Sequence, residues 1–452
     1  MRWMPPVLPA PWTTPLDATT FGPACPQRNH PGLPQAEDCL LLNVWTHASG
    51  PRRPVIVWIH GGGYVEGAAR EPQYDGAALA RSANAIVVSI DYRLGVLGFL
   101  ALPQLAASDG GIGNFGIRDQ IAALGWVHRN IGVLGGDPAN VMIVGESAGG
   151  AAVCTLAGAP SAQGLFSAAA IESGPCRLAL SLTAPTGTFP AAEAYGAIAV
   201  AAPLGCTSGD IATCLRGKSV AQILALNLPF YWDLGIPVFA TLPVVDGVVL
   251  DHRPLDALRA GRGAVPMIVG SNRDDASVFI YTIGVTDTAG AFDGYLHTIG
   301  QAANQSALDA LYPVVTLGER GAAIQYATDV AFGCASLQVT AAHMAPTYLY
   351  ELERPVPNGP LAMYGSVHGF DFVSLFATFS TWQVTPGAAD LATSADMQAQ
   401  WSALAHGITP TSWPAAAGTN PSFRKLDMTP TVAMGWRDGR CAQLAALGVL
   451  AM

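Results

Sequence analysis

Residues 141 to 152 read Val-Met-Ile-Val-Gly-Glu-Ser-Ala-Gly-Gly-Ala-Ala, and this stretch predicts the fold. An apolar run typical of a buried strand leads into Gly-Glu-Ser-Ala-Gly, and small residues that can begin a helix follow. Glycine on both sides of Ser147 is expected where a strand turns sharply into a helix, because larger side chains have no room there. The alternative is a glycine-rich turn with an incidental serine, but strand, turn and helix signals coincide. We therefore predict a strained turn that presents the Ser147 hydroxyl as a nucleophile.

Other apolar, β-branched runs recur along the chain, and helical patterns lie between them. The clearest helical pattern is 119–131, where apolar residues recur every three or four positions. Strands that alternate with helices favour a mainly parallel sheet covered on both faces, so the predicted fold class is α/β. The predicted strands are 54–59, 85–90, 141–145, 168–172, 265–270 and 347–350.

Between these elements the strand rhythm lapses twice, at about 180–260 and about 284–340. Both segments are rich in Ala, Leu or Pro and look helical or irregular. We expect them to be cap-like insertions that contribute to a substrate pocket over the active edge of the sheet. No fixed-period repeat and no low-complexity linker divides the chain, so residues 1–452 are interpreted as a single domain.

The composition excludes several classes of function. Charged residues make up 12% of the chain and the net charge is −10, with no local cluster of Lys and Arg, so a nucleic-acid partner is not expected. The longest charge-free stretches are interrupted by polar residues and proline, which argues against a membrane span. We expect a small-molecule ligand and a monomer or weak homo-oligomer.

Eight cysteines give conflicting information about location. Cys25 with Cys39, and Cys206 with Cys214, each enclose a short loop that suits a disulfide in an oxidising compartment, whereas the alternative is scattered buried thiols. Secretion or a periplasmic location is the favoured interpretation. The first residues, Met-Arg-Trp-Met-Pro-Pro, lack the apolar core of a signal peptide, so a cytoplasmic location stays open.

A second glycine-rich loop follows the predicted strand at 54–59. It reads His60-Gly61-Gly62-Gly63-Tyr64. Successive glycines let backbone N–H groups approach a ligand closely, and with Ala148 they can supply donors to a developing oxyanion. Alone the motif is weak, since a phosphate loop or a simple turn has the same composition. Its position after a strand and upstream of the Ser147 turn favours the oxyanion interpretation.

Together these motifs resemble the type-B carboxylesterase family, the carboxylesterase, lipase and cholinesterase relatives, in a bacterial-type esterase. The resemblance covers nearly the whole chain and implies an α/β-hydrolase fold. The matching segments stand in family order: 37–45, 60–64, 91–95, 119–120, 135–138 and 145–150.

The resemblance also implies roles for individual residues. Ser147 corresponds to the nucleophile, and Gly62, Gly63 and Ala148 correspond to the oxyanion donors. The cysteine pairs 25–39 and 206–214 correspond to family disulfides, while a pair between Cys334 and Cys441 is left open. Family members commonly begin further upstream with small strands, so the chain is expected to start inside the fold.

His368 is the predicted base. The chain order of serine, acid and histidine in this fold restricts the choice to four histidines, at 297, 343, 368 and 406. His368 lies in Gly-Ser-Val-His-Gly-Phe-Asp-Phe at 365–372, which resembles the family's catalytic-histidine segment. The other three stand in polar or helical contexts typical of surface or capping roles.

Asp275 is the predicted acid. It follows the predicted strand at 265–270 and matches the family's acid loop, where glutamate is more common. The shorter side chain requires the loop or the histidine to move closer. Either carboxylate can hold the imidazole tautomer and stabilise its cation. Asp274 is interpreted as a loop brace, with a minority case for being the acid.

Neighbouring polar residues are given supporting roles. Glu146 is expected to leave the strand on the side opposite Ser147 and, with Ser173, to support the triad from behind. Arg93 and Asp137 are interpreted as braces of the fold. The expected pocket wall is aromatic and comprises Tyr64, Phe230, Tyr231, Trp232, Phe279, Phe370 and Phe376.

The predicted reaction is hydrolysis of carboxylic esters through an acyl-enzyme, with no cofactor or metal. The loop 26–38 lacks the tryptophan with which cholinesterases hold a quaternary ammonium, so choline esters are disfavoured. The stretch 174–179 lacks a bulky aromatic, which favours short to medium acyl chains. The alternatives are hydrolysis of amides, lactones or thioesters by the same triad, and a non-catalytic adhesion-type relative.

Overall fold

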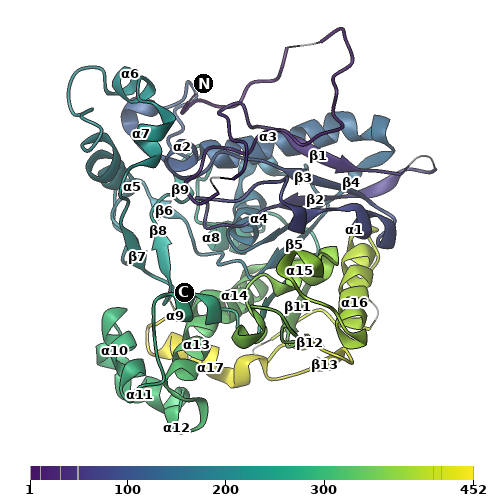
Figure 1. Ribbon diagram of the computed structural model, residues 1–452, viewed down its shortest axis with the longest axis vertical. Helices are drawn as coiled ribbons and strands as arrows, with labels where there is room; N and C mark the ends of the chain where they lie inside the picture. The colour runs from purple at the N-terminus through teal and green to yellow at the C-terminus, as the bar shows by residue number, and fades with distance from the viewer. Residues whose placement is uncertain are drawn as a thin grey trace.

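A nine-stranded sheet runs through the centre of the computed structural model (Figure 1). The structure describes residues 2–10, 12–30, 32–47, 50–410, 412–418 and 420–450. Within these ranges the strand order is β1-β3-β2-β4-β5-β10-β11-β12-β13. The strands are β1 Leu42–Trp45, β2 Arg53–Ile59, β3 Ile86–Ile90, β4 Gly136–Glu146, β5 Ala168–Glu172, β10 Met267–Asn272, β11 Thr347–Leu352, β12 Phe423–Leu426 and β13 Thr431–Ala433.

The pairing of these strands is parallel except at the two edges. From β3 across to β12 every neighbouring pair is parallel. The edge strands β1 and β13 pair antiparallel with β3 and β12. Parallel strands place their carboxyl ends at one rim of the sheet, so the loops that follow β2, β4, β10 and β11 share that rim.

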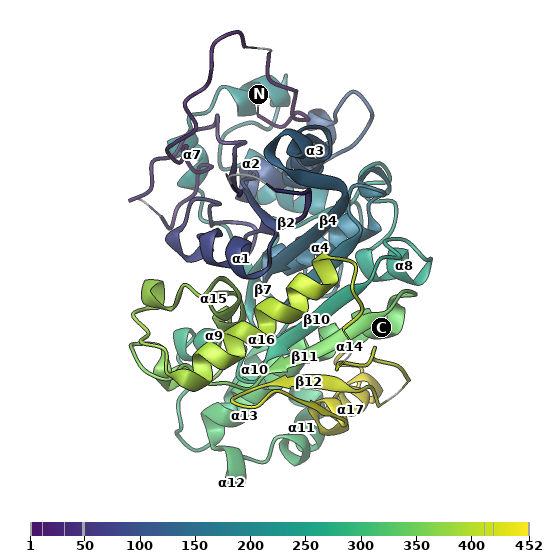
Figure 2. The same ribbon diagram turned by 90° about the vertical axis from the view of Figure 1, so that its right-hand side faces the viewer.

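Alternating side chains of the strands form two separate cores. In β4, Val141 and Ile143 belong to the cluster that includes helices α3 (Phe115–Asn130), α4 (Ala148–Gly158) and α14 (Cys334–Ala342). Met142 and Val144 belong to the cluster on the opposite face, with helices α1 (Ala77–Ser82), α15 (Phe370–Phe376) and α16 (Ala388–Ala405). Figure 2 shows α16 lying across the strands on this second face. The mainly parallel, doubly covered α/β sheet predicted from the sequence is confirmed.

Each predicted strand corresponds to an observed one, with end shifts of at most two residues except at β4, which begins five residues before the predicted 141–145. The stretch 168–172 coincides with β5, and 265–270 begins two residues before β10. The predicted helix 119–131 is α3, which begins earlier, at Phe115. The edge strands β1 and β13 and the short β12 were not predicted, because their side chains are partly exposed or polar and lack a buried apolar run.

The two expected insertions fold as short elements on the left side of Figure 1. The interpretation of the chain as a single domain stays a prediction. The first insertion, from about 180 to 260, contains α5 Ala192–Tyr195, α6 Ile211–Arg216, α7 Val220–Leu224, α8 Pro254–Arg259 and the small pairs β6 Leu180–Ser181 with β9 Val244–Val245 and β7 Phe230–Trp232 with β8 Pro237–Phe239. The second contains α10 Ala291–Thr298, α11 Gln305–Leu311, α12 Val314–Leu317, α13 Glu319–Thr328 and part of α14.

Four disulfide bonds pair all eight cysteines, which all lie in the described ranges. The pairs 25–39 and 206–214 are present, and Cys334, in α14, pairs with Cys441, in α17 (Arg440–Ala446). The fourth bond, Cys154–Cys176, was not predicted. It ties the helix that follows Ser147 to the loop that follows β5.

The longest helix in the described part of the chain is α16, with 18 residues. It packs on the sheet through residues such as Trp401 and leaves others, such as Leu391, exposed. No helix in this part of the chain is long and apolar enough to cross a bilayer.

Candidate active site

Ser147 occupies a strained turn between β4 and α4. Its backbone has φ 57° and ψ −123°, a conformation that residues other than glycine rarely adopt. The turn is held from below, since Ser147 N–H donates to Glu172 O at 2.9 Å. Such strain persists only where the surrounding structure enforces it, and it marks a candidate functional position.

The flanking glycines are required by close backbone packing. A Cβ atom at Gly145 would lie 2.4 Å from Gly149 O, and one at Gly149 would lie 2.0 Å from Ile59 O. Both distances are shorter than van der Waals contact between heavy atoms allows. The turn is therefore compressed against the end of β2, as the sequence motif predicts.

The glycine loop that follows β2 lies against this turn. A Cβ atom at Gly61 would lie 3.1 Å from the Cβ of Ser147. Gly62 and Gly63 have φ of 100° and 61°, and their N–H groups donate to no described residue. Ala148 is the first residue of α4, so its N–H precedes any acceptor within the helix. The three predicted oxyanion donors are thus unpaired beside Ser147.

His368 is held by Asp275. His368 precedes α15, Asp275 follows β10, and the Nδ1 atom of His368 lies 2.6 Å from Asp275 Oδ1. The imidazole is almost buried, and its Nε2 atom has no hydrogen-bond partner in the described structure. The hydroxyl of Ser147 makes no hydrogen bond to His368 among the described residues. In proteins without bound substrate such catalytic hydrogen bonds are often long and tighten on binding.

The Asp275 carboxylate is completely buried and fully engaged. Besides the imidazole, it accepts hydrogen bonds from Ser173 Oγ and from Asn272 N–H, each at 2.8 Å. Asp274 faces another way, toward the backbone N–H of Ser366 and the side chain of Arg273. The geometry therefore separates the two aspartates, with Asp275 against the imidazole and Asp274 bracing the loops.

Glu146 contacts the imidazole of His368 directly. This contact was not predicted, because Glu146 was expected to leave the strand on the side opposite Ser147. Its Oε1 atom lies 3.2 Å from His368 Nε2. Because Glu146 precedes Ser147, this distance places Nε2 of the imidazole at the strand-to-helix turn. His368 thus lies between the Asp275 carboxylate and the turn that carries Ser147.

The pKa of His368 reflects these two carboxylates. Burial alone lowers it, but the negative charge of Glu146 and the hydrogen bond and charge of Asp275 outweigh burial and raise the pKa to about 9. Burial also raises the pKa of Glu146, to about 8. Protonation of Glu146 removes part of the charge that raises the pKa of His368, so the two groups titrate together.

Two further buried acids belong to the same group of charges, and neither was assigned a role from the sequence. Asp371 raises the pKa of His368, and the charges of Asp371 and Glu146 act on Glu172. Asp371 accepts hydrogen bonds from Ser173 Oγ at 3.2 Å and Tyr350 Oη at 2.8 Å, and burial and the charge of Asp275 raise its pKa to about 6. Glu172 accepts from Trp401 Nε1 at 2.7 Å, and burial raises its pKa. Asp371 belongs to the segment 365–372 and Glu172 directly precedes Ser173, so their places beside candidate site residues were the available signal.

The aromatic pocket wall predicted from the sequence is only partly present. Phe279 packs against His368 with ring centroids 5.2 Å apart, and the unpredicted Phe332 is closer, at 4.7 Å. Phe370 and Phe376 are fully buried in the core on the α16 face of the sheet, so their assignment to the pocket wall is wrong. The sequence around His368 could not show which aromatic side chains face the site, because Phe370 and Phe376 lie on the helix α15, whose sides contact different neighbours.

The three remaining histidines of the set considered lie in unrelated hydrogen-bond networks. His343 contacts Gly263 O and Thr347 Oγ1, and His406 contacts Ala83 O. His297 contacts Gln305 on the molecular surface. Arg93 forms a buried two-point ion pair with Asp119, at 2.7 Å for both contacts, as expected of a brace. Only His368 of the four lies at the turn that carries Ser147.

A parallel sheet with helices on both faces, with a serine at a strained turn and a histidine–acid pair on later loops of the same rim, defines an α/β-hydrolase. The model of the carboxylesterase family matches residues 1–444. The chain belongs to the carboxylesterase family.

Comparison with individual proteins also finds carboxylesterases and related esterases. Human cocaine esterase is 38% identical over 341 residues, which cover 71% of this chain and 57% of the relative. Mouse carboxylesterase 1D is 34% identical over 435 residues, with coverage of 84% and 73%. Para-nitrobenzyl esterase of Bacillus subtilis is 34% identical over 368 residues, with coverage of 78% and 71%. The match thus spans little more than half of the first relative's length and almost three quarters of the other two.

Proposed function

We propose that this protein hydrolyses carboxylic esters, with Ser147 as nucleophile, His368 as general base and Asp275 as the acid that orients the imidazole. The observation that carries the proposal is the position of His368, whose Nδ1 lies 2.6 Å from Asp275 while its Nε2 lies at the turn that carries Ser147. Membership of the carboxylesterase family supports the same chemistry.

The reaction proceeds in two steps. His368 Nε2 takes the proton of Ser147, and the alkoxide attacks the ester carbonyl. The tetrahedral oxyanion accepts hydrogen bonds from the N–H groups of Gly62, Gly63 and Ala148, and each such donor lowers the barrier by about 3 kcal/mol. The alcohol leaves with the proton from His368, and water activated by the same imidazole then releases the carboxylate product. Asp275 stabilises the imidazolium in both steps.

We infer that the preferred substrates are esters with short to medium acyl chains. The stretch 174–179 follows Ser173 and carries no bulky aromatic side chain, which leaves room for an acyl group. The rings of Phe279 and Phe332 beside His368 supply an apolar surface. The same residues could act on amides, lactones or thioesters, and substrate comparison distinguishes these classes.

The test compares p-nitrophenyl esters from acetate to palmitate with the matching p-nitroanilides. We expect kcat/KM to be highest for short to medium esters and to be far lower for every anilide, because an amine is a much poorer leaving group. The alcohol or amine chromophore reports both reactions in the same assay. Faster turnover of the anilides would contradict the ester assignment, and absence of turnover with every substrate would favour a non-catalytic relative.

The pH profile is expected to reveal the charge of Glu146. His368 must be neutral to act as a base, and its raised pKa places the acid limb of kcat/KM above the ordinary histidine value of about 6.5. The substitution Glu146→Gln removes a negative charge 3.2 Å from Nε2, which lowers the pKa of His368 and moves the limb to lower pH. Asp256→Asn, at an exposed site on α8, serves as the matched control. Coincident limbs in wild type and Glu146→Gln would exclude this coupling.

We propose further that the protein works in an oxidising compartment. Structural disulfides are rare in reducing compartments and common in secreted proteins. All eight cysteines are paired here, including the buried Cys154–Cys176 bond directly behind the Ser147 turn. This supports export from the cytoplasm.

A further inference from the structure

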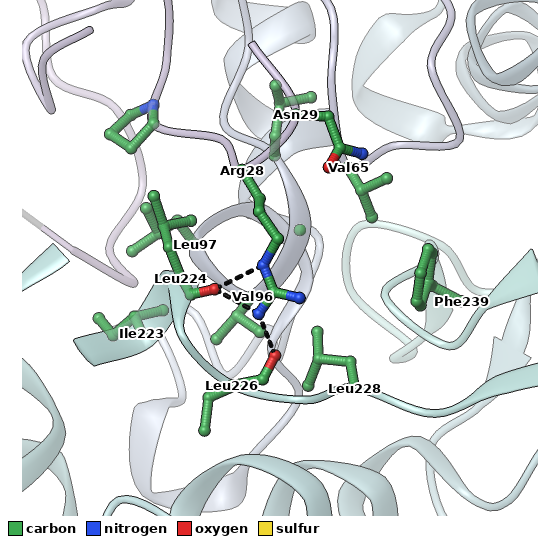
Figure 3. Close-up of a pocket in the computed structure, with 13 residues that line it drawn as sticks. Arg28, Asn29, Val65, Val96, Leu97, Ile223, Leu224, Leu226, Leu228 and Phe239 are labelled. Carbon is green, nitrogen blue, oxygen red and sulfur yellow. Dashed lines mark hydrogen bonds between the residues drawn. The ribbon is translucent and has the colours of Figure 1, made fainter. Parts of the chain in front are cut away.

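A cavity of about 130 Å³ lies apart from the triad candidates (Figure 3). Its walls come from four places in the chain: the disulfide loop between Cys25 and Cys39, Val65 in the loop after β2, the segment 94–97 at the start of α2 (Gly95–Phe99), and the stretch from α7 to β8. Ser147, His368 and Asp275 do not line it. Nothing in the proposed ester chemistry uses this cavity.

Arg28, an exposed residue of the lining, places a positive charge at the solvent-accessible side of the cavity. Its Nε and Nη2 atoms donate to Leu224 O at 2.9 and 2.6 Å, and Nη2 also donates to Leu226 O at 2.6 Å. The third nitrogen, Nη1, donates to no described residue, and Figure 3 shows it directed away from both carbonyl groups. The two carbonyls therefore fix the guanidinium and leave one edge of it available to an acceptor.

Apart from Arg28 and Asn29, the side chains that line the cavity are apolar. Val65, Val96, Leu97, Leu228 and Phe239 are among the residues that line the space. Arg28 is the one ionisable side chain of the thirteen lining residues, and the Asn29 amide supplies a further polar group. No carboxylate of the lining neutralises Arg28. An apolar pocket with one fixed cation is complementary to an anion attached to an apolar chain.

The cavity adjoins the loop that carries the predicted oxyanion donors. Val65 N–H donates to Gly62 O at 3.0 Å, and Gly95 N–H donates to Tyr64 O at 2.6 Å. A molecule in the cavity would therefore contact residues bonded to the glycine loop while remaining outside the triad. Its binding can be measured without any catalytic turnover.

We propose that this cavity binds a carboxylate with an unbranched alkyl chain, with the carboxylate on the free edge of Arg28 and the chain against the leucine and valine walls. Guanidinium binds carboxylate through charge-assisted hydrogen bonds, and the apolar walls gain by leaving water. The competing interpretation is that Arg28 only ties the disulfide loop to the end of α7. That role requires the two carbonyl contacts but predicts no preference for an anionic ligand.

Calorimetric titration with octanoate and with 1-octanol tests the proposal, since the two differ in charge and share the chain. We expect the Kd of octanoate for the wild-type protein to be at least about tenfold lower than that of octanol, because one charge-assisted hydrogen bond contributes a difference of this size. Arg28→Met should abolish this difference. Leu228→Trp should weaken both ligands by filling the cavity while retaining Arg28.

Arg129→Met provides the matched control, because it removes the same charge from an exposed position of α3. It should bind octanoate as the wild type does, and thermal unfolding should verify that every variant is folded. Equal affinity of the wild type for octanoate and octanol would overturn the proposal. So would octanoate binding that survives both Arg28→Met and Leu228→Trp, because the ligand would then lie elsewhere. Neither result depends on whether Ser147 is the nucleophile.

Discussion

Replacing Ser147 with alanine is expected to lower kcat for p-nitrophenyl butyrate by on the order of 10⁶-fold, the loss typical of removing a catalytic serine. No other hydroxyl can substitute, because the strained turn directs residue 147 toward the glycine loop and the neighbouring Ser173 is engaged with Asp275 and Asp371. The variant should remain folded, since the substitution removes one oxygen atom that makes no hydrogen bond within the described structure.

Covalent labelling makes this prediction specific. A phosphate triester such as diethyl p-nitrophenyl phosphate should release one equivalent of p-nitrophenol from the wild type and modify Ser147, as identified by peptide mass spectrometry. Ser208→Ala, at an exposed serine, should behave as the wild type in both measurements. Wild-type turnover by Ser147→Ala, or a label on a different residue, would refute the assignment of the nucleophile.

Asp275→Asn is expected to lower kcat by about 10⁴-fold, as loss of the orienting carboxylate does in other serine hydrolases. An amide in this place either presents its NH₂ group to Nδ1 or leaves the imidazolium without its buried counter-charge. Both outcomes disfavour the tautomer that leaves Nε2 free to accept the Ser147 proton. The effect should appear in kcat more than in KM, because Asp275 is buried and removed from the substrate.

Asp274→Asn is the natural control for this substitution, because the adjacent carboxylate contacts Ser366 and Arg273 and not the imidazole. It should retain activity within about tenfold of the wild type while lowering the free energy of unfolding by about 1 kcal/mol through the weakened loop contacts. Asp275→Glu, which restores a carboxylate, should recover part of the lost activity. A larger loss of kcat in Asp274→Asn than in Asp275→Asn would show that Asp274, and not Asp275, is the acid.

Much of the fold could be predicted from local patterns because its central strands are buried on both faces. Runs such as 54–59 and 168–172 are continuous, apolar and bounded by turns, which is sufficient to identify them. The edge strands β1 and β13 offered no such signal, because their residues are partly or fully exposed and form no buried apolar run. The pairing of β1 also depends on β3, which lies more than 40 residues further along the chain. The helix α16 was not predicted for a similar reason. Only some of its residues, such as Trp401, pack on the sheet, whereas others, such as Leu391, are exposed.

The Ser147 turn and the glycine loop follow from steric requirements within a few residues, so the local amino-acid order was sufficient to predict them. Which charges surround His368 was decided by the tertiary structure alone. Glu146, Asp275 and Asp371 come from segments more than 90 residues apart, and parallel strand order brings the ends of β4, β10 and β11 to one rim. The Cys154–Cys176 bond has the same origin, since α4 and the loop after β5 meet only when β4 and β5 pair. Local sterics can be read from adjacent residues, whereas burial and charge depend on what the folded chain places around them.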